Sequence, residues 1–417
     1  MPPLKLLLSL LLLLGLSCLS QAAERTRQAS KATYDSLVLV NGLMEQDRHI
    51  EARKELDALL QRVQKRPYEL ALTHQSYGYV AIGLDDYPVA IDHFQEALGS
   101  EQLPSEVAHR LRFTTAQLLV EEGQPQAALK MLKRWFEAEA EPSPESRVLL
   151  AQVHYSLKQG KPAIREMKRA IADASSPRES WYQFLAGLYL EGNQLKPAAR
   201  LLEKMIRLFP GKDLYWRQLA GVLLQAGKEP RAVAVMTLAQ EKGLLQPEER
   251  LSLARLYLHQ QMPLDAAQLL SRSLANGDLE RNPETLNLLA DAWLLAREQE
   301  RALKVLAELS TTDRSGRTHL RMGGLLFELE RWAEAAAMLK KGLRLSGKAR
   351  QDDWLLLGVA SVRANDPETA SRAFAEALET AASKQEREQA QRWLDYLRIP
   401  RQPESVVEAT DTAMTSG

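Results

Sequence analysis

A small residue that recurs about every 35 positions constrains this 417-residue chain more than any other feature. Each marker alanine has a small residue twelve positions before it and a large apolar residue four positions after it. The nine markers are Ala90, Ala128, Ala163, Ala198, Ala232, Ala266, Ala302, Ala335 and Ala370. Neighbouring markers are 33 to 38 residues apart, and a fixed period of this size is the signature of a repeat protein. Most of the chain is therefore expected to be one array of similar units.

The residue types around each marker predict a pair of antiparallel helices. Small residues suit the places where two helices approach closely, and large apolar residues fill the space beside them. Turn signals such as "EGQP" at 122–125 and "QAGKEP" at 225–230 fall between the two predicted helices of a unit. Prolines such as Pro210, Pro247 and Pro283 fall between units, where a helix has to stop. No long stretch alternates with period two, so the fold is expected to be all-α.

Each unit resembles the tetratricopeptide repeat. The unit from Asp213 has Trp216, Leu219-Ala220, Leu223, Ala232, Met236 and Ala239 at the signature positions of that family. The unit from Gln351 has Trp354, Leu357-Gly358, Ala370, Phe374 and Ala377, and a degenerate first copy uses Ala52 and Leu56. The resemblance implies a right-handed α-solenoid of roughly ten helix-turn-helix repeats over residues 33–383. Residues 384–400 are expected to form a C-terminal capping helix, and residues 401–417 a disordered tail.

The N-terminus carries an apolar run from Leu6 to Leu19 after Lys5. The run is shorter than a membrane-spanning helix, and small residues follow it at Ser20–Ala23, so residues 1–23 are interpreted as a secretory signal peptide. Residues 24–32 would then be a linker. A lipoprotein signal with lipid on Cys18 and an uncleaved membrane anchor remain as alternatives. Cys18 is the only cysteine, so no disulfide framework or thiolate metal cluster is expected.

The composition argues against nucleic acid and against catalysis. Lys plus Arg and Asp plus Glu both number 54, so the chain has no net charge with which to attract phosphates. The basic stretch "KMLKRWF" at 130–136 is interpreted as a helix edge beside a buried Trp135. The seven histidines are scattered without the i, i+4 spacing of a metal site, and no phosphate-binding loop or serine elbow is present. We therefore expect no enzyme activity, no cofactor, no metal and no catalytic residues.

The expected site is the groove that lines the inner side of a tetratricopeptide superhelix. In that family the first helix of each pair faces the groove, which binds an extended segment or a helix of another protein. The aromatic, amide and charged candidates suit recognition by a few anchors and hydrogen bonds. They are Tyr79, Phe113, Gln117, Gln152, Tyr155, Gln183, Arg217, Arg255, Asn287 and Asp291. The Lys and Asn pairs with which some family members clamp a terminal carboxylate are not recognisable.

The order of features is similar to that of periplasmic tetratricopeptide proteins encoded beside TonB-, ExbB- and ExbD-type components. It comprises the apolar N-terminus, "YGYVAIGLDDYPVAIDHFQEAL" at Tyr77, "GLLQPEERLSLARLYL" at Gly243 and "AQRWLDYLR" at Ala390. The similarity implies a periplasmic, noncatalytic partner of an inner-membrane energy-transduction complex. Membrane contact would then occur only through partners, or through lipid on Cys18. Two alternatives stay open: an assembly factor for an outer-membrane, pilus or polysaccharide-secretion complex, and an accessory that holds a periplasmic enzyme.

Overall fold

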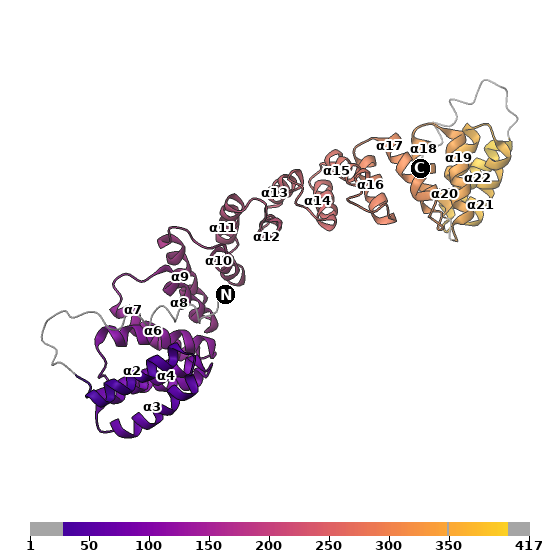
Figure 1. Cartoon of the computed structure of the whole chain (residues 1–417). Helices are drawn as coiled ribbons and strands as arrows, with labels where there is room; N and C mark the ends of the chain where they lie inside the picture. The colour runs from indigo at the N-terminus through magenta and orange to yellow at the C-terminus, as the bar shows by residue number, and fades with distance from the viewer. Residues whose placement is uncertain (1–27, 348–349, 399–417) are drawn as a thin grey trace. The chain divides into compact units, whose positions relative to one another are not determined.

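The computed structural model describes residues 28–347 and 350–398. The predicted signal peptide, the first four residues of the predicted linker (24–27), the last two of the predicted capping helix (399–400) and the predicted C-terminal tail lie outside the described residues. All the regular secondary structure within them is helical, and each helix packs mainly against its neighbours in sequence (Figure 1). The predicted all-α array is confirmed: within the described residues α2 to α21 follow one another as the first and second helices of ten repeats, and α22 comes after them.

The first helices of the pairs are α2 (Lys31–Glu45), α4 (Pro67–Gly83), α6 (Ser105–Glu121), α8 (Pro144–Ser156), α10 (Glu179–Glu191), α12 (Asp213–Gln225), α14 (Pro247–His259), α16 (Pro283–Leu295), α18 (Arg317–Glu328) and α20 (Gln351–Arg363). The second helices are α3 (His49–Val63), α5 (Tyr87–Gly99), α7 (Pro125–Ala138), α9 (Gly160–Asp173), α11 (Leu195–Leu208), α13 (Glu229–Glu241), α15 (Pro263–Ala275), α17 (Gln299–Ser310), α19 (Trp332–Leu345) and α21 (Pro367–Glu379). The last helix is α22 (Lys384–Arg398). Helix α2 thus begins inside the segment that was predicted to be a linker.

The helices group into two compact units, and the boundary falls between Gln194 and Leu195. In the first unit each helix from α2 to α10 packs against the next, and in the second the same holds from α11 to α22. The boundary therefore lies in the turn between α10 and α11, which the sequence pattern places inside a single repeat.

The core of each unit is built by the marker residues. All nine marker alanines have no exposed surface. The residue four positions later is also buried in every repeat, from Phe94 in α5 to Phe374 in α21. Burial of both positions once per repeat confirms the predicted register.

The small residue twelve positions before the marker sets how closely the paired helices approach. A Cβ atom added to Gly78 would lie 2.2 Å from the ring of Phe94, and one added to Gly358 would lie 2.3 Å from the ring of Phe374. Real Cβ atoms do not approach other atoms this closely, so both glycines are required by packing. These contacts confirm the prediction that a small residue lies where the paired helices approach most closely and that a large apolar residue fills the space beside it.

The turn inside each helix pair has one repeated backbone geometry. In all ten turns one residue has a positive φ, and in eight of them that residue is not glycine, as with Asp85, Gln261 and Arg297. The next residue donates its backbone N–H to the carbonyl five positions earlier, as Asp86 does to Ala81 and Met262 does to Tyr257. This is the hydrogen bond of a Schellman motif, which satisfies a carbonyl left over at the helix end. The left-handed position of such a turn is usually glycine, but among these ten turns only two have it, at Gly123 and Gly227. Backbone hydrogen bonds therefore define the turn in the other eight.

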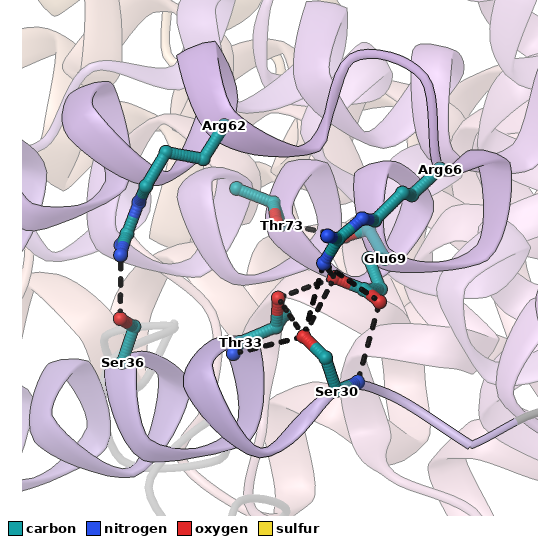
Figure 2. A network of polar contacts seen from close by, with 7 residues as sticks. All are labelled: Ser30, Thr33, Ser36, Arg62, Arg66, Glu69 and Thr73. Atoms are coloured by element: carbon teal, nitrogen blue, oxygen red, sulfur yellow. Dashed lines mark hydrogen bonds and ion pairs between the residues drawn. The ribbon is translucent and has the colours of Figure 1, made fainter.

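Polar contacts of Glu69 hold the N-terminal helix α2 on α4. The Glu69 carboxylate accepts hydrogen bonds from the backbone N–H and hydroxyl of Ser30, from the hydroxyl of Thr33 and from Arg66 (Figure 2). Burial raises the pKa of Glu69, but these hydrogen bonds outweigh it and hold the pKa below its usual value. Because Ser30 is also the N-cap of α2, the network fixes the start of that helix.

The C-terminal helix α22 covers the last repeat. Trp393 of α22 stacks on Phe374 with ring centroids 5.2 Å apart, and Ala390 is fully buried. Within the described residues, no helix combines the length and the apolar character needed to span a bilayer.

Candidate protein-binding faces

The ten predicted groove residues all lie on first helices, but they belong to two units. Six are in the first unit, on α4, α6, α8 and α10, and four are in the second unit, on α12, α14 and α16. We call the exposed sides of these helices the first-helix faces, one in each unit.

In the second unit the predicted residues join neighbouring repeats through charged contacts. The Nε of Arg217 in α12 lies 3.0 Å from a carboxylate oxygen of Glu249 in α14. Arg255 in α14 donates to Glu284 in α16 at 2.6 Å. About half of each arginine side chain remains exposed, so the contacts lie at the surface. These are the first two of a series of polar contacts that connect each first helix with the next, and we call this series the ladder.

The last rung of the ladder connects α16 with α18. Arg321 donates to Asn287 at 3.1 Å and to Asp291 at 2.5 Å. The structure thus brings Asn287 and Asp291 together, with Arg321 as their shared partner. Sequence reasoning missed Glu249, Glu284 and Arg321. These three residues could have been found in the sequence, because each lies about one repeat after a predicted residue, on the next first helix, and each can pair with it through charge or hydrogen bonds.

Exposed apolar side chains accompany the ladder. Leu214 and Leu224 of α12 lie three residues before and seven residues after Arg217, on the same side of the helix, and they are 41% and 37% exposed. Leu295 of α16, four residues after Asp291, is 63% exposed. Between Leu214 and Leu224, Gly221 has no atom within 4 Å of the place where a Cβ would stand. The second first-helix face therefore combines apolar side chains, fixed charges and a point where the helix backbone is open to contact.

The first unit uses two of the predicted aromatic anchors for packing. Tyr79 meets the edge of Phe94 at 5.1 Å, and Phe113 contacts Trp135 at 4.8 Å. Both side chains are half-buried against the core of the first unit. Trp135 itself is 7% exposed, as the sequence predicted. Tyr79 and Phe113 therefore have little free surface for a partner.

Tyr155 is the predicted aromatic residue that remains available, with 42% of its surface exposed. Its hydroxyl donates to Glu191 of α10 at 2.7 Å, and this hydrogen bond raises the pKa of Tyr155. The side chain lines a pocket of about 730 Å³ between α8, α9 and α10, together with Lys158, Lys161 and Leu188. Of the predicted amides, Gln117 and Gln152 are half-buried and Gln183 is exposed.

Two histidines that the sequence pattern treats as separate residues form a pair in the first unit. The Nδ1 atoms of His74 in α4 and His93 in α5 are 2.8 Å apart, and His93 stacks on Tyr77 with ring centroids 3.9 Å apart. Burial lowers the pKa of both imidazoles, and the proximity of His74 lowers that of His93 further. Tyr77 in turn donates to Asp57 of α3, and burial together with this hydrogen bond raises its pKa to about 12. Among the described residues, no group of three or more His, Cys, Asp or Glu side chains could hold a metal ion.

Comparisons with known proteins give structural matches only. No protein-family model matches the sequence, and no curated protein matches it. A tetratricopeptide repeat protein from Parabacteroides merdae is 14% identical, with 62% of this chain and 98% of that chain covered and a TM-score of 0.37. The MamA protein is 20% identical, with 41% and 91% covered and a TM-score of 0.35. YrrB, described as a tetratricopeptide protein with an unusual peptide-binding site, is 16% identical, with 47% and 100% covered and a TM-score of 0.36.

These superpositions are loose. The description of this chain as a solenoid of helix pairs stands on its own contacts, on its buried marker residues and on the shared turn geometry.

Proposed function

We propose that the protein is a noncatalytic scaffold that binds partner proteins through its first-helix faces. The observation that carries the proposal is the face of the second unit. There, Leu214, Leu224 and Leu295 are exposed beside side chains that the ladder already holds in place. Apolar anchors among fixed polar groups suit a peptide segment or a helix, because ordered side chains lose little further entropy on binding.

The more specific part of the proposal is an accessory role in a TonB/ExbB/ExbD-type energy-transduction complex in the periplasm. Its support is the similarity of feature order in the sequence and the apolar N-terminal run after Lys5. Cleavage of that run would leave an N-terminus near Ala22–Glu24. N-terminal sequencing of the protein recovered from the periplasmic fraction tests this export step. An intact Met1 in a cytoplasmic fraction would contradict it.

The binding proposal is tested by crosslinking in intact cells, affinity capture of the tagged protein and mass spectrometry. Capture by the unaltered protein is compared with capture by Leu224→Ala/Leu295→Ala, which trims the second first-helix face. We expect the double variant to lose most of the partner while its helical circular-dichroism signal is unchanged, because both side chains are already exposed.

A matched control is Leu238→Ala/Leu264→Ala. These leucines are 49% and 45% exposed, but they lie on the second helices α13 and α15. Equal loss of capture in both double variants would contradict the assigned face. Capture of outer-membrane or polysaccharide-assembly proteins without TonB-, ExbB- or ExbD-like subunits would replace the energy-transduction role with the assembly-factor alternative. Capture of a periplasmic enzyme would favour the enzyme-accessory alternative.

A further inference from the structure

Seven basic side chains, six of them at repeated positions, lie on two second helices of the first unit. The residues that lie two, five and six positions after the marker alanine are basic in both α7 and α9, and Lys161 adds a further charge at the start of α9. We call these residues the basic face: Lys130, Lys133, Arg134, Lys161, Arg165, Lys168 and Arg169. All seven are exposed. Because successive repeats turn equivalent positions to the same side, the two rows share one outer surface of the first unit.

The charge of the basic face is local, and the carboxylates of Glu166 and of the exposed Glu137, one turn after Lys133 in α7, offset only part of it. Within the described chain, Arg165 and Arg169 contact the buried carboxylate of Glu166 at 2.9 and 3.5 Å, whereas the four lysines and Arg134 form no ion pair. The equivalent positions of the preceding repeat carry the acids Asp92 and Glu96 on α5. A chain without net charge thus concentrates cations on α7 and α9.

The basic face lacks the apolar and aromatic anchors that are typical of protein interfaces. No large apolar residue of α7 or α9 is among the exposed ones, and two of the three arginines of the face are engaged with Glu166. Neither α7 nor α9 carries an exposed aromatic ring on which the bases of a single-stranded nucleic acid could stack, and Tyr155, beside Lys161 in the pocket, is a single ring. Long cationic side chains alone suit a diffuse anionic surface, to which each contributes separately through charge.

We propose that the basic face docks the first unit onto a bilayer surface that carries anionic phospholipid headgroups. The expected export route supports this choice of anionic surface, because the apolar run at Leu6–Leu19 would bring the chain to a membrane. Docking is electrostatic and peripheral. It is therefore reversed by salt, which screens exposed charges beyond about 10 Å at 0.1 M ionic strength.

The test is co-sedimentation of the full chain with vesicles of phosphatidylcholine alone and with vesicles that contain about a third phosphatidylglycerol. The N-terminal apolar run can insert into both lipids, so the difference between the two partition coefficients isolates the charge-dependent part. The test variant replaces four exposed lysines that form no ion pair and spares the arginines that hold Glu166. It is Lys130→Gln/Lys133→Gln/Lys161→Gln/Lys168→Gln.

The matched control removes the same net charge from exposed lysines outside the basic face. It is Lys54→Gln/Lys65→Gln/Lys228→Gln/Lys242→Gln. Each lysine lost from the basic face is expected to lower partitioning onto anionic vesicles roughly fivefold, so the test variant falls by several-hundred-fold. The control is expected to fall far less. Both variants are expected to melt as the unaltered chain does, since exposed lysines contribute little to folding.

Three results would overturn the proposal. One is equal partitioning of the unaltered chain onto the two kinds of vesicle. Another is an equal loss in the test and control variants, which would indicate attraction by net charge without a defined face. The third is binding of a single-stranded oligonucleotide that the test variant loses, in a chain that does not distinguish the vesicles. That result would assign the basic face to nucleic acid.

Discussion

At the scale of the residue, the contact between Gly78 and Phe94 controls how closely α4 and α5 pack. Gly78→Ala places a methyl group 2.2 to 2.9 Å from three ring atoms of a fully buried side chain. Because Phe94 is fully buried, overpacking is expected to lower the free energy of unfolding by about 1–3 kcal/mol.

Gly187→Ala in α10 is the control, because no atom lies within 4 Å of its Cβ position. Alanine favours a helix interior over glycine, so this variant is expected to gain up to about 1 kcal/mol. Urea denaturation of both variants measures the difference. A Gly78→Ala protein as stable as Gly187→Ala would show that the packing is looser than the structure indicates.

At the same scale, the burial of some side chains could be predicted from the sequence, whereas particular contacts between side chains could not. The burial of Ala90 and Phe94 follows from a period that can be counted along the chain. The contacts of Arg321 with Asn287 and of His74 with His93 do not, because they depend on how helices are rotated against each other. Tyr79 and Phe113 were predicted to face the groove from their positions in the repeat, and their contacts with the rings of Phe94 and Trp135, which leave them half-buried, could not be predicted in that way.

At the scale of the element, most of the polar contacts that attach helix α2 to α4 are hydrogen bonds to the carboxylate of Glu69. The pKa of Glu69 is lowered in the folded chain, so the ionised form stabilises the attachment. This stabilisation is complete above the unfolded pKa of about 4.5 and is lost as the pH falls through the folded value.

Glu69→Gln is expected to weaken the attachment of α2 at neutral pH by about 1.5–3 kcal/mol, the usual contribution of a hydrogen bond to a charged group. Hydrogen exchange of the α2 amides measures this. In the unaltered chain their exchange should accelerate below pH 4.5 relative to that of the variant, after correction for intrinsic rates. Parallel pH dependence in the two proteins would show that Glu69 does not control α2.

At the scale of the whole molecule, the division between Gln194 and Leu195 separates two sets of local contacts. A one-dimensional array transmits stability through its nearest neighbours, so damage to one repeat weakens the repeats beside it most. The sequence did not reveal the division, since "EGNQ" at 191–194 has the same turn chemistry as the other repeats.

Leu132→Ala in α7 and Leu306→Ala in α17 each remove a fully buried side chain, the first in one unit and the second in the other. Each is expected to cost about 2–5 kcal/mol locally. Hydrogen-exchange mass spectrometry should show faster exchange in α6–α9 for Leu132→Ala and in α16–α19 for Leu306→Ala. Uniform acceleration along the chain in either variant would indicate a single cooperative unit.

The ten similar turns have a consequence for how such a chain can change over evolutionary time. Backbone hydrogen bonds hold each turn, and aspartate, lysine, asparagine, glutamine, arginine and glutamate all occupy the left-handed position. Mutations at this position change an exposed residue, are expected to change stability little, and leave the buried alanines untouched. Each turn can therefore acquire new side chains for binding, or accept a grafted peptide, independently of the other repeats.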